Sequence, residues 1–286
     1  MGRARFAVVA FIAFACAVSP AVVAQQRKAQ PPGAVRLYVF DCGKLDIPDL
    51  APYQLTRAEI ATNVMSVACF LVAHPRGTLM WDVGAVPDRL IPSGGAGTLR
   101  GYGSSTRRLE TQLNEIGYAP ADITYLSLSH FHWDHVGNAN MFARATWLVR
   151  KAERDMMFAE PPSPRTEPDN FSALKNSKTT MIATADYDVF GDGRVVIKAA
   201  PGHSPGHQVL FINLARTGPV VLSGDLYHYP EERTLKKVPT TEFDRQQSAA
   251  SRAAIEAFLV RTHAQLWIQH DYTAFAKLKK APAYYE

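Results

Sequence analysis

The sequence predicts an α+β fold in which two mixed β-sheets pack face to face with helices outside, a four-layer αββα sandwich. Three observations predict it: strand patterns dominate both halves of the chain, helical patterns follow strands in each half, and no change of composition separates the halves. The 286 residues are 47% hydrophobic and 20% charged, which is typical of a globular protein large enough for a substantial core.

Strand patterns in the first half lead to a histidine-rich segment. β-branched and aromatic residues mark these strands, and residues 75–77 predict the turn of a hairpin. Residues 104–106 offer a helix cap, and Gly117 ends that helix. The strands predicted in this half are residues 35–41, 63–73, 78–83, 123–129 and 146–149.

The second half combines short strands with the longest helical pattern. That pattern spans residues 243–263 and places its apolar side on Ala250, Ala253, Ala257 and Phe258. A shorter helix is predicted at residues 151–158, followed at 160–178 by a proline-containing surface loop suited to covering a site. The strands predicted in this half are residues 195–199, 209–214, 220–222 and 266–269.

The N-terminal segment is predicted to direct export. Arg3 and Arg5 precede an uncharged apolar stretch at residues 6–18 that is too short for a membrane span, and Ala24 suits a signal-peptidase site. We expect a periplasmic or secreted protein with no stable membrane insertion after cleavage, the alternative being an uncleaved anchor. The predicted segments are a signal peptide (1–24), a flexible leader (25–34) and one folded domain (35–286).

Charge and cysteine content narrow the class of partner. Removal of Arg3 and Arg5 would reduce the net charge from +5 to +3, and no dense basic run remains, so no nucleic-acid partner is expected. Cleavage would also remove Cys16 and leave Cys42 and Cys69. Export permits a disulfide between them, but their apolar surroundings suit two buried free thiols equally well.

The chemistry centres on the run His130-Phe131-His132-Trp133-Asp134-His135, directly after a predicted strand. Residues i and i+2 of an extended segment project to the same side, so His130 and His132 can reach one metal ion together. Asp134 and His135 lie on the following turn and can face a second position. The alternative is a polar surface loop, which three histidines among six residues make improbable. Imidazole and carboxylate donors suit zinc, and also iron, cobalt or manganese.

These residues resemble the metal motif of the metallo-β-lactamase superfamily, and four further segments match it in order. Together the matches extend from about residue 35 to residue 271. The matching segments are an early structural aspartate turn, a metal-histidine loop, a bridging-aspartate segment and a last metal-histidine segment. In that order, they are Asp82-Val83-Gly84, Pro201-Gly202-His203-Ser204-Pro205-Gly206-His207, Leu222-Ser223-Gly224-Asp225 and Ile268-Gln269-His270-Asp271.

The resemblance implies two divalent metal ions, with zinc expected. It assigns His130, His132 and His203 to one ion, implies that Asp225 bridges both, and leaves a shared water between them. The remaining ligands are Asp134, His135 and His270.

Taken singly, three of these residues have ordinary alternatives. His203 could be a turn residue, Asp225 a strand-end cap and His270 a buried hydrogen-bonded histidine. His207 is expected to support its loop rather than to bind metal.

Within the superfamily, the pattern is most similar to the N-acyl-homoserine lactone lactonases. The run from Pro201 to Gln208 carries the likeness, together with an inserted segment at residues 45–62. An aspartate at Asp225 speaks against the β-lactamase branches. The resemblance implies that the insertion forms an acyl pocket and a dimer contact, so a homodimer is one expected arrangement. The apolar residues that could line this pocket, or else pack on the sheet, are Ile47, Leu50, Tyr53, Leu55 and Ile60.

One position departs from the lactonase pattern. The family often has a tyrosine three residues after the bridging aspartate, whereas this chain has His228 between Tyr227 and Tyr229. We therefore expect His228 itself, or one of its neighbours Tyr227 and Tyr229, to donate a hydrogen bond to the substrate carbonyl.

The resemblance implies attack on a lactone or ester by a hydroxide that bridges the metals, with Asp134 or Asp225 carrying the proton. Aryl esters, phosphotriesters and β-lactams are the alternative substrates on the same site.

Overall fold

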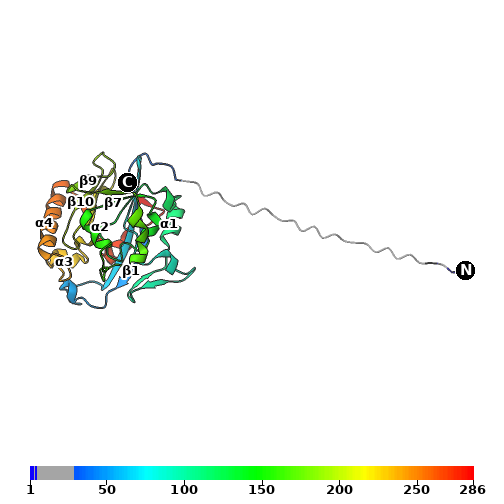
Figure 1. Cartoon of the computed structure of the whole chain (residues 1–286), viewed down its shortest axis with the longest axis horizontal. Coiled ribbons are helices and arrows are strands. Elements are labelled where there is room, and N and C mark those ends of the chain that lie inside the picture. The colour runs from blue at the N-terminus through cyan, green and yellow to red at the C-terminus, as the bar shows by residue number, and fades with distance from the viewer. Residues whose placement is uncertain (3, 5–28) are drawn as a thin grey trace.

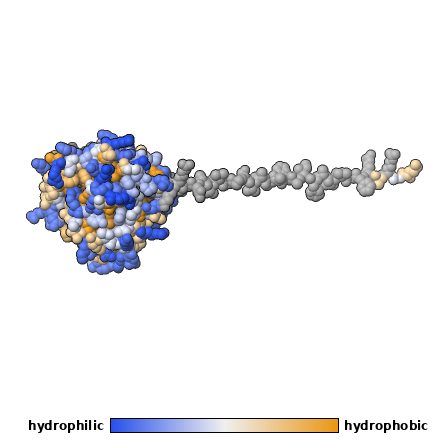
Figure 2. Space-filling model, turned by 90° about the horizontal axis from the view of Figure 1, so that it is seen from above, coloured by the Kyte–Doolittle hydropathy of each residue, from blue (hydrophilic) through white to orange (hydrophobic). Residues whose placement is uncertain are grey.

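The computed structural model describes residues 1, 2, 4 and 29–286, and Figure 1 shows a folded part with helices outside its sheets. The apolar stretch at residues 6–18 and the predicted cleavage site lie outside the described residues. Within the described part of the chain, no helix combines the length and apolar character needed to cross a membrane. The face of the folded part seen in Figure 2 intersperses hydrophilic and hydrophobic residues.

Within residues 29–286, the first sheet has nine strands, ordered β4-β5-β1-β2-β3-β6-β7-β8 with β14 beside β1. β1, β2 and β3 pair antiparallel, whereas β3, β6, β7 and β8 run parallel, so the sheet is mixed as predicted. Its strands are β1 (Arg36–Asp46), β2 (Val64–His74), β3 (Gly77–Trp81), β4 (Gly97–Leu99), β5 (Gly103–Ser105), β6 (Tyr125–Ser127), β7 (Thr146–Val149), β8 (Thr179–Met181) and β14 (Tyr284–Tyr285).

In the same described part of the chain, the second sheet has five strands, ordered β13-β12-β11-β10-β9. All neighbours pair antiparallel except β12 and β13, which run parallel. The strands are β9 (Asp186–Asp188), β10 (Val195–Ala199), β11 (Gln208–Leu214), β12 (Gly218–Leu222) and β13 (Gln265–Trp267). The helices are α1 (Leu109–Glu115), α2 (Lys151–Met157), α3 (Pro230–Thr234), α4 (Arg245–Thr262) and α5 (Tyr272–Lys277).

Alternating side chains on the strands build the layers. On β1, Leu37 and Val39 face the core between the sheets, which they share with Ile197 and Leu210 of the second sheet. The intervening residues of β1 belong to the core that includes Leu109 of α1. A third core lies between the second sheet and α4. The four-layer αββα prediction is therefore confirmed.

Two helix details differ from the prediction. The predicted cap at residues 104–106 is instead largely strand β5, and α1 begins at Leu109. Its first backbone N–H groups donate to a distant carboxylate, because Asp88 accepts from Leu109 and Glu110, each at 2.9 Å. A residue 21 positions away thus satisfies donors that a local side chain was expected to satisfy.

The buried face of α4 also differs from the predicted one. Ser248, Ser251, Arg252, Ile255 and Leu259 are buried, whereas the three alanines expected there are exposed. Specific hydrogen bonds compensate the buried polar groups. The Ser251 hydroxyl donates to the Pro201 carbonyl at 2.6 Å, and Arg252 Nε donates to the Leu226 carbonyl at 2.7 Å.

The described end of the predicted leader contacts the domain. The Ala29 N–H donates to the Gly117 carbonyl at 2.9 Å, and Pro32 is buried. Ala29 also packs against the core that includes Tyr118, and it lines a surface recess together with Pro31 and Pro32.

Cys42 and Cys69 form a disulfide that links β1 to β2. This decides between the two alternatives that the sequence left open. The bond closes a loop with a sequence separation of 27. Cross-linking a loop of this size restricts the unfolded chain and contributes about 3 kcal/mol to folding.

Replacing Cys42 and Cys69 by alanine is expected to reduce the free energy of unfolding by about 2–4 kcal/mol. Urea unfolding of the oxidised wild type, the reduced wild type and the double variant measures this effect. The reduced wild type should approach the variant. Equal midpoints for all three samples would contradict the expected contribution.

Candidate metal centre

The loop that follows β6 forms hydrogen bonds with a buried aspartate. The Ser129 N–H and hydroxyl both donate to the Asp82 carboxylate, at 2.6 and 2.8 Å. Asp82 is fully buried and has a φ of 51° directly after β3. The predicted aspartate turn therefore positions the residues that begin the histidine cluster.

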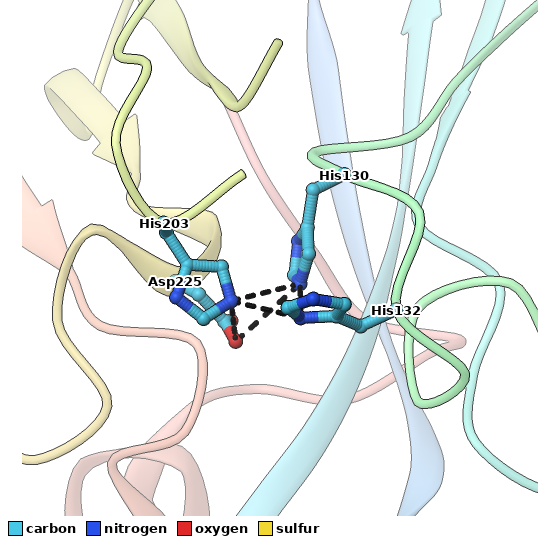
Figure 3. A group of neighbouring side chains, drawn as sticks. All are labelled: His130, His132, His203 and Asp225. Carbon is cyan, nitrogen blue, oxygen red and sulfur yellow. Dashed lines mark hydrogen bonds and ion pairs between the residues drawn. The ribbon is translucent and has the colours of Figure 1, made fainter. Parts of the chain in front are cut away.

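Three imidazoles and one carboxylate form a first group of donors (Figure 3). His130 Nε2 lies 2.8 Å from His132 Nδ1, and His203 Nε2 lies 3.2 and 2.9 Å from those two atoms. Asp225 Oδ2 lies 3.3 Å from His203 Nε2 and 3.6 Å from His130 Nε2. Ligand atoms around a tetrahedral zinc are about 3.3–3.4 Å apart, so this spacing accommodates one cation.

A second group lies on the other side of Asp225. Asp225 Oδ1 is 3.1 Å from both His135 Nε2 and His270 Nε2. Asp134 Oδ2 is 3.7 Å from His135 Nε2 and 3.5 Å from His270 Nε2. One oxygen of Asp225 faces each group, which is the arrangement of a bridging carboxylate.

Unpaired buried atoms test whether these residues fit metal ions. Within the described part of the chain, His135 Nε2, His270 Nε2 and Asp225 Oδ1 are buried without a hydrogen-bond partner. Leaving such an atom unsatisfied costs about 1–3 kcal/mol. A cation among them would satisfy all three. The donor set therefore fits two divalent metal ions, and all seven predicted ligands lie together.

Hydrogen bonds on the outer side orient most of the imidazoles. His135 Nδ1 lies 2.9 Å from the Asp82 carboxylate, and His270 Nδ1 donates to the Ser66 carbonyl at 2.7 Å. His203 Nδ1 lies 3.3 Å from Glu242 Oε1. Such contacts turn the Nε2 lone pair towards a metal.

His207 supports the site without joining it, as expected. Its Nδ1 donates to the Ala200 carbonyl at 2.9 Å, and its Nε2 accepts from the Asp225 N–H, also at 2.9 Å. His207 thereby fixes the backbone of the bridging residue.

Electrostatics prepare the donors of the first group, His130, His132, His203 and Asp225, for a cation. Burial lowers the pKa of His130, His132 and His203 well below the usual 6.5, so these imidazoles are neutral at neutral pH. Burial alone would raise the pKa of Asp225, but the surrounding histidines, first His135, lower it well below the usual 3.8. A neutral imidazole and an ionised carboxylate are the forms that bind metal.

A buried carboxylate that the motifs do not include joins the two ligand loops. Glu153, on α2, accepts from the Phe131 N–H at 2.6 Å, and also from the Ser204 hydroxyl at 2.7 Å and the Gly206 N–H at 2.8 Å. Burial raises the pKa of Glu153 to about 7. Nothing in the local pattern of α2 distinguishes this glutamate, because its partners lie 22 to 53 positions away.

Replacing Glu153 with glutamine is expected to weaken both folding and metal retention. An amide retains one acceptor oxygen, so the N–H of Phe131 or Gly206 loses its partner at a cost of about 1–3 kcal/mol. Urea unfolding and elemental analysis after dialysis measure the two effects. The exposed Glu160→Gln is the matched control. Identical behaviour of both variants would refute a role for Glu153 in holding the loops.

A cavity of about 240 Å³ opens over the donors. Tyr53, Tyr102 and Trp133 contribute aromatic rings to it, and Arg100 and Arg165 contribute guanidinium groups. The tyrosine from the inserted segment was predicted only as an apolar wall, but its ring lies 5.0 Å from the ring of His228.

The proposed acyl groove is only partly formed by the predicted residues. Ile47 and Tyr53 line the cavity. Leu55 and Ile60 are instead buried in the core beside the first sheet, and Leu50 packs against it. These side chains follow the alternative of packing on the sheet, because burial in the core removes them from water.

Two of the residues predicted to donate to the substrate, His228 and Tyr227, point in different directions. His228 faces the centre, with Nε2 3.3 Å from Asp225 Oδ2 and Nδ1 3.2 Å from Glu232 Oε1. The Tyr227 hydroxyl instead donates to Glu256 Oε1 at 3.1 Å. Tyr227 does not line the cavity, so its predicted catalytic role is wrong; alternation along the chain turns it to the opposite side.

Comparisons with known proteins match this architecture. The family model described as metallo-beta-lactamase superfamily matches residues 62–270. The N-acyl homoserine lactonase AttM of Azorhizobium caulinodans is 29% identical over 269 residues, covering 88% of this chain and 99% of the relative. An N-acyl homoserine lactonase of Bacillus cereus is 28% identical, covering 77% of this chain and 87% of that protein.

Solved structures agree with the fold. An N-acyl homoserine lactone hydrolase with the product N-hexanoyl-L-homoserine at its catalytic metal center superposes with a TM-score of 0.73 at 23% identity. This superposition covers 87% of the present chain and 98% of the hydrolase chain. AidC, a dizinc quorum-quenching lactonase, gives a TM-score of 0.65 at 19% identity over 91% and 96% of the two chains.

Proposed function

The chain belongs to the metallo-β-lactamase superfamily, and we propose that it is a dinuclear metal hydrolase that opens N-acyl-homoserine lactones. The observation that carries this proposal is the position of Asp225. Its two oxygens face separate groups of donors at the floor of one cavity. The lactonase names of relatives that align over nearly their full length support the substrate class.

Zinc is the proposed metal. The first group offers three imidazoles and a carboxylate, a donor set that suits zinc. When bound, two such cations would activate a water as the nucleophile and polarise the lactone carbonyl. In the overall reaction, water oxygen bonds to the carbonyl carbon, the ring C–O bond breaks, and the leaving alkoxide takes a proton.

The chain itself positions the substrate and moves this proton. Burial, followed by the neighbouring Tyr229, raises the pKa of Tyr53 well above 10, so its hydroxyl keeps its proton and can donate to the lactone carbonyl. Tyr53 thus takes the place of the tyrosine that this chain lacks at position 228. We assign proton transfer to the leaving oxygen to the carboxylate of Asp134, which lies at the cavity wall.

Replacing Tyr53 with phenylalanine is expected to lower kcat by about 10²-fold, the effect of losing one donor to a developing oxyanion. Steady-state kinetics on a lactone measure it. Tyr229→Phe is the matched control, since that hydroxyl donates to the Asn63 carbonyl and does not line the cavity. Equal losses in both variants would refute a donor role for Tyr53.

A substrate panel on metal-analysed protein tests the function. We expect faster opening of N-acyl-homoserine lactones, with one acid equivalent released per ring, than hydrolysis of aryl esters, phosphotriesters or β-lactams. A higher kcat/KM for any of these competitors would overturn the assignment.

We also propose that the protein is exported. The Cys42–Cys69 disulfide supports this, because disulfides persist in oxidising compartments. N-terminal sequencing of the protein from a periplasmic fraction tests it, and a mature chain beginning at Gln25 is the expected result.

A further inference from the structure

Arg165 lies at the edge of the cavity, in the loop between α2 and β8. Its backbone carbonyl accepts from the Trp133 N–H at 3.0 Å, in the middle of the metal-binding motif. Its Nη2 donates to the Thr241 carbonyl at 2.8 Å. The loop and the side chain are therefore both attached to the walls of the site.

The two arginines of the cavity differ in their partners. The donors of Arg100 are occupied: it pairs with Glu167 at 2.7 Å and donates to the carbonyls of Pro164 and Thr166. Its guanidinium also lies against the Trp133 ring. Arg165, among the residues that the structure describes, forms no ion pair, and the Thr241 carbonyl is the one acceptor of its guanidinium. Most of its donors remain available.

The acidic groups nearby have other partners. Asp134 and Asp225 are the carboxylates that line the cavity, and both belong to the metal-binding groups. The Glu242 carboxylate contacts His203 Nδ1 and accepts a hydrogen bond from the Ser248 hydroxyl. Arg165 is thus a permanent positive charge beside a cavity with no spare carboxylate to neutralise it.

A guanidinium presents N–H donors in a fork that matches a carboxylate. We propose that Arg165 binds a carboxylate at the end of the acyl chain, so that this site prefers lactones with a short, anionic acyl group. This rests on the proposed lactonase function. The cavity volume of about 240 Å³ favours a short chain over a long one. Arg165 is half-buried in the cavity lining, so its guanidinium can meet the end of such a chain at the boundary with solvent.

Two substrates that differ in one group test this preference. N-Glutaryl-homoserine lactone carries a terminal carboxylate, and its glutaramoyl analogue carries a neutral carboxamide of the same size. The metal-loaded wild type is expected to give a kcat/KM about 10-fold higher for the anionic substrate, as one charge-assisted contact provides. Added salt should reduce the ratio, because screening weakens exposed charge pairs.

Substitution assigns the preference to Arg165. Arg165→Gln is expected to reduce the ratio towards one, Arg165→Lys to retain part of it, and the exposed Arg144→Gln to leave it unchanged. A ratio near one in the wild type, or a ratio that Arg165→Gln leaves intact, would overturn the proposal.

The outcome also separates this inference from the proposed function. If the neutral lactone opens and the ratio is near one, only the role of Arg165 fails. If neither lactone opens, the lactonase assignment fails. Calorimetric binding of ring-opened N-glutaryl-homoserine to the wild type and Arg165→Gln then tests the arginine directly. Tighter binding to the wild type would support the role, and equal affinities would refute it.

Discussion

Replacing Asp225 with asparagine is expected to reduce kcat/KM by about 10³-fold or more and to lower the metal content of the purified protein. Loss of one group that stabilises a transition state already costs about 10²–10³-fold. Asp225 contributes to both groups of donors, with Oδ1 3.1 Å from His135 Nε2 and Oδ2 3.3 Å from His203 Nε2. An amide removes the negative charge from both metal positions at once.

Elemental analysis and lactone kinetics on the same sample measure this result. The exposed Asp155→Asn is the matched control, because it removes one carboxylate of α2 that pairs with Lys151, away from the metal-binding groups. Circular dichroism verifies that the variant is folded. Full metal content with full activity in Asp225→Asn would contradict a bridging role.

Chelation is expected to abolish activity and to destabilise the fold. Without cations, three buried atoms of the described residues, His135 Nε2, His270 Nε2 and Asp225 Oδ1, form no hydrogen bond. A ligand at about 1,000 times its Kd stabilises the native state by about 4 kcal/mol for each site. Removal of both metals should therefore lower the free energy of unfolding by several kcal/mol.

Dialysis against a chelator, then addition of zinc, measures both effects. Activity and the unfolding midpoint should fall together and return together. Dialysis against the chelator already saturated with zinc is the control for effects of the chelator itself. Retained turnover in protein shown to be metal-free would contradict the proposed mechanism.

The metal-binding residues could be predicted because most of them lie in short ordered motifs. Three histidines and an aspartate between His130 and His135 share one loop, so their proximity follows from local geometry. His203 and His270 required the resemblance to a family, because 67 positions separate them and only the fold brings them together.

The residues around the metals could not be predicted from local patterns. Glu153 joins two ligand loops through partners on separate segments. Tyr53 reaches the cavity from the inserted segment, whereas Tyr227, which is closer to Asp225 in the sequence, turns towards Glu256. The polarity of a residue does not reveal which distant group it will meet. The strand pattern, by contrast, follows from alternation along each segment, and the predicted layers were confirmed.

The central claim is that seven side chains hold two cations that share Asp225. Anomalous diffraction at the zinc absorption edge, on crystals of zinc-loaded protein, tests it most directly. We predict two peaks, one among His130, His132 and His203 and one among Asp134, His135 and His270, with Asp225 between them. A single peak, or peaks only elsewhere on the molecule, would contradict the dinuclear site.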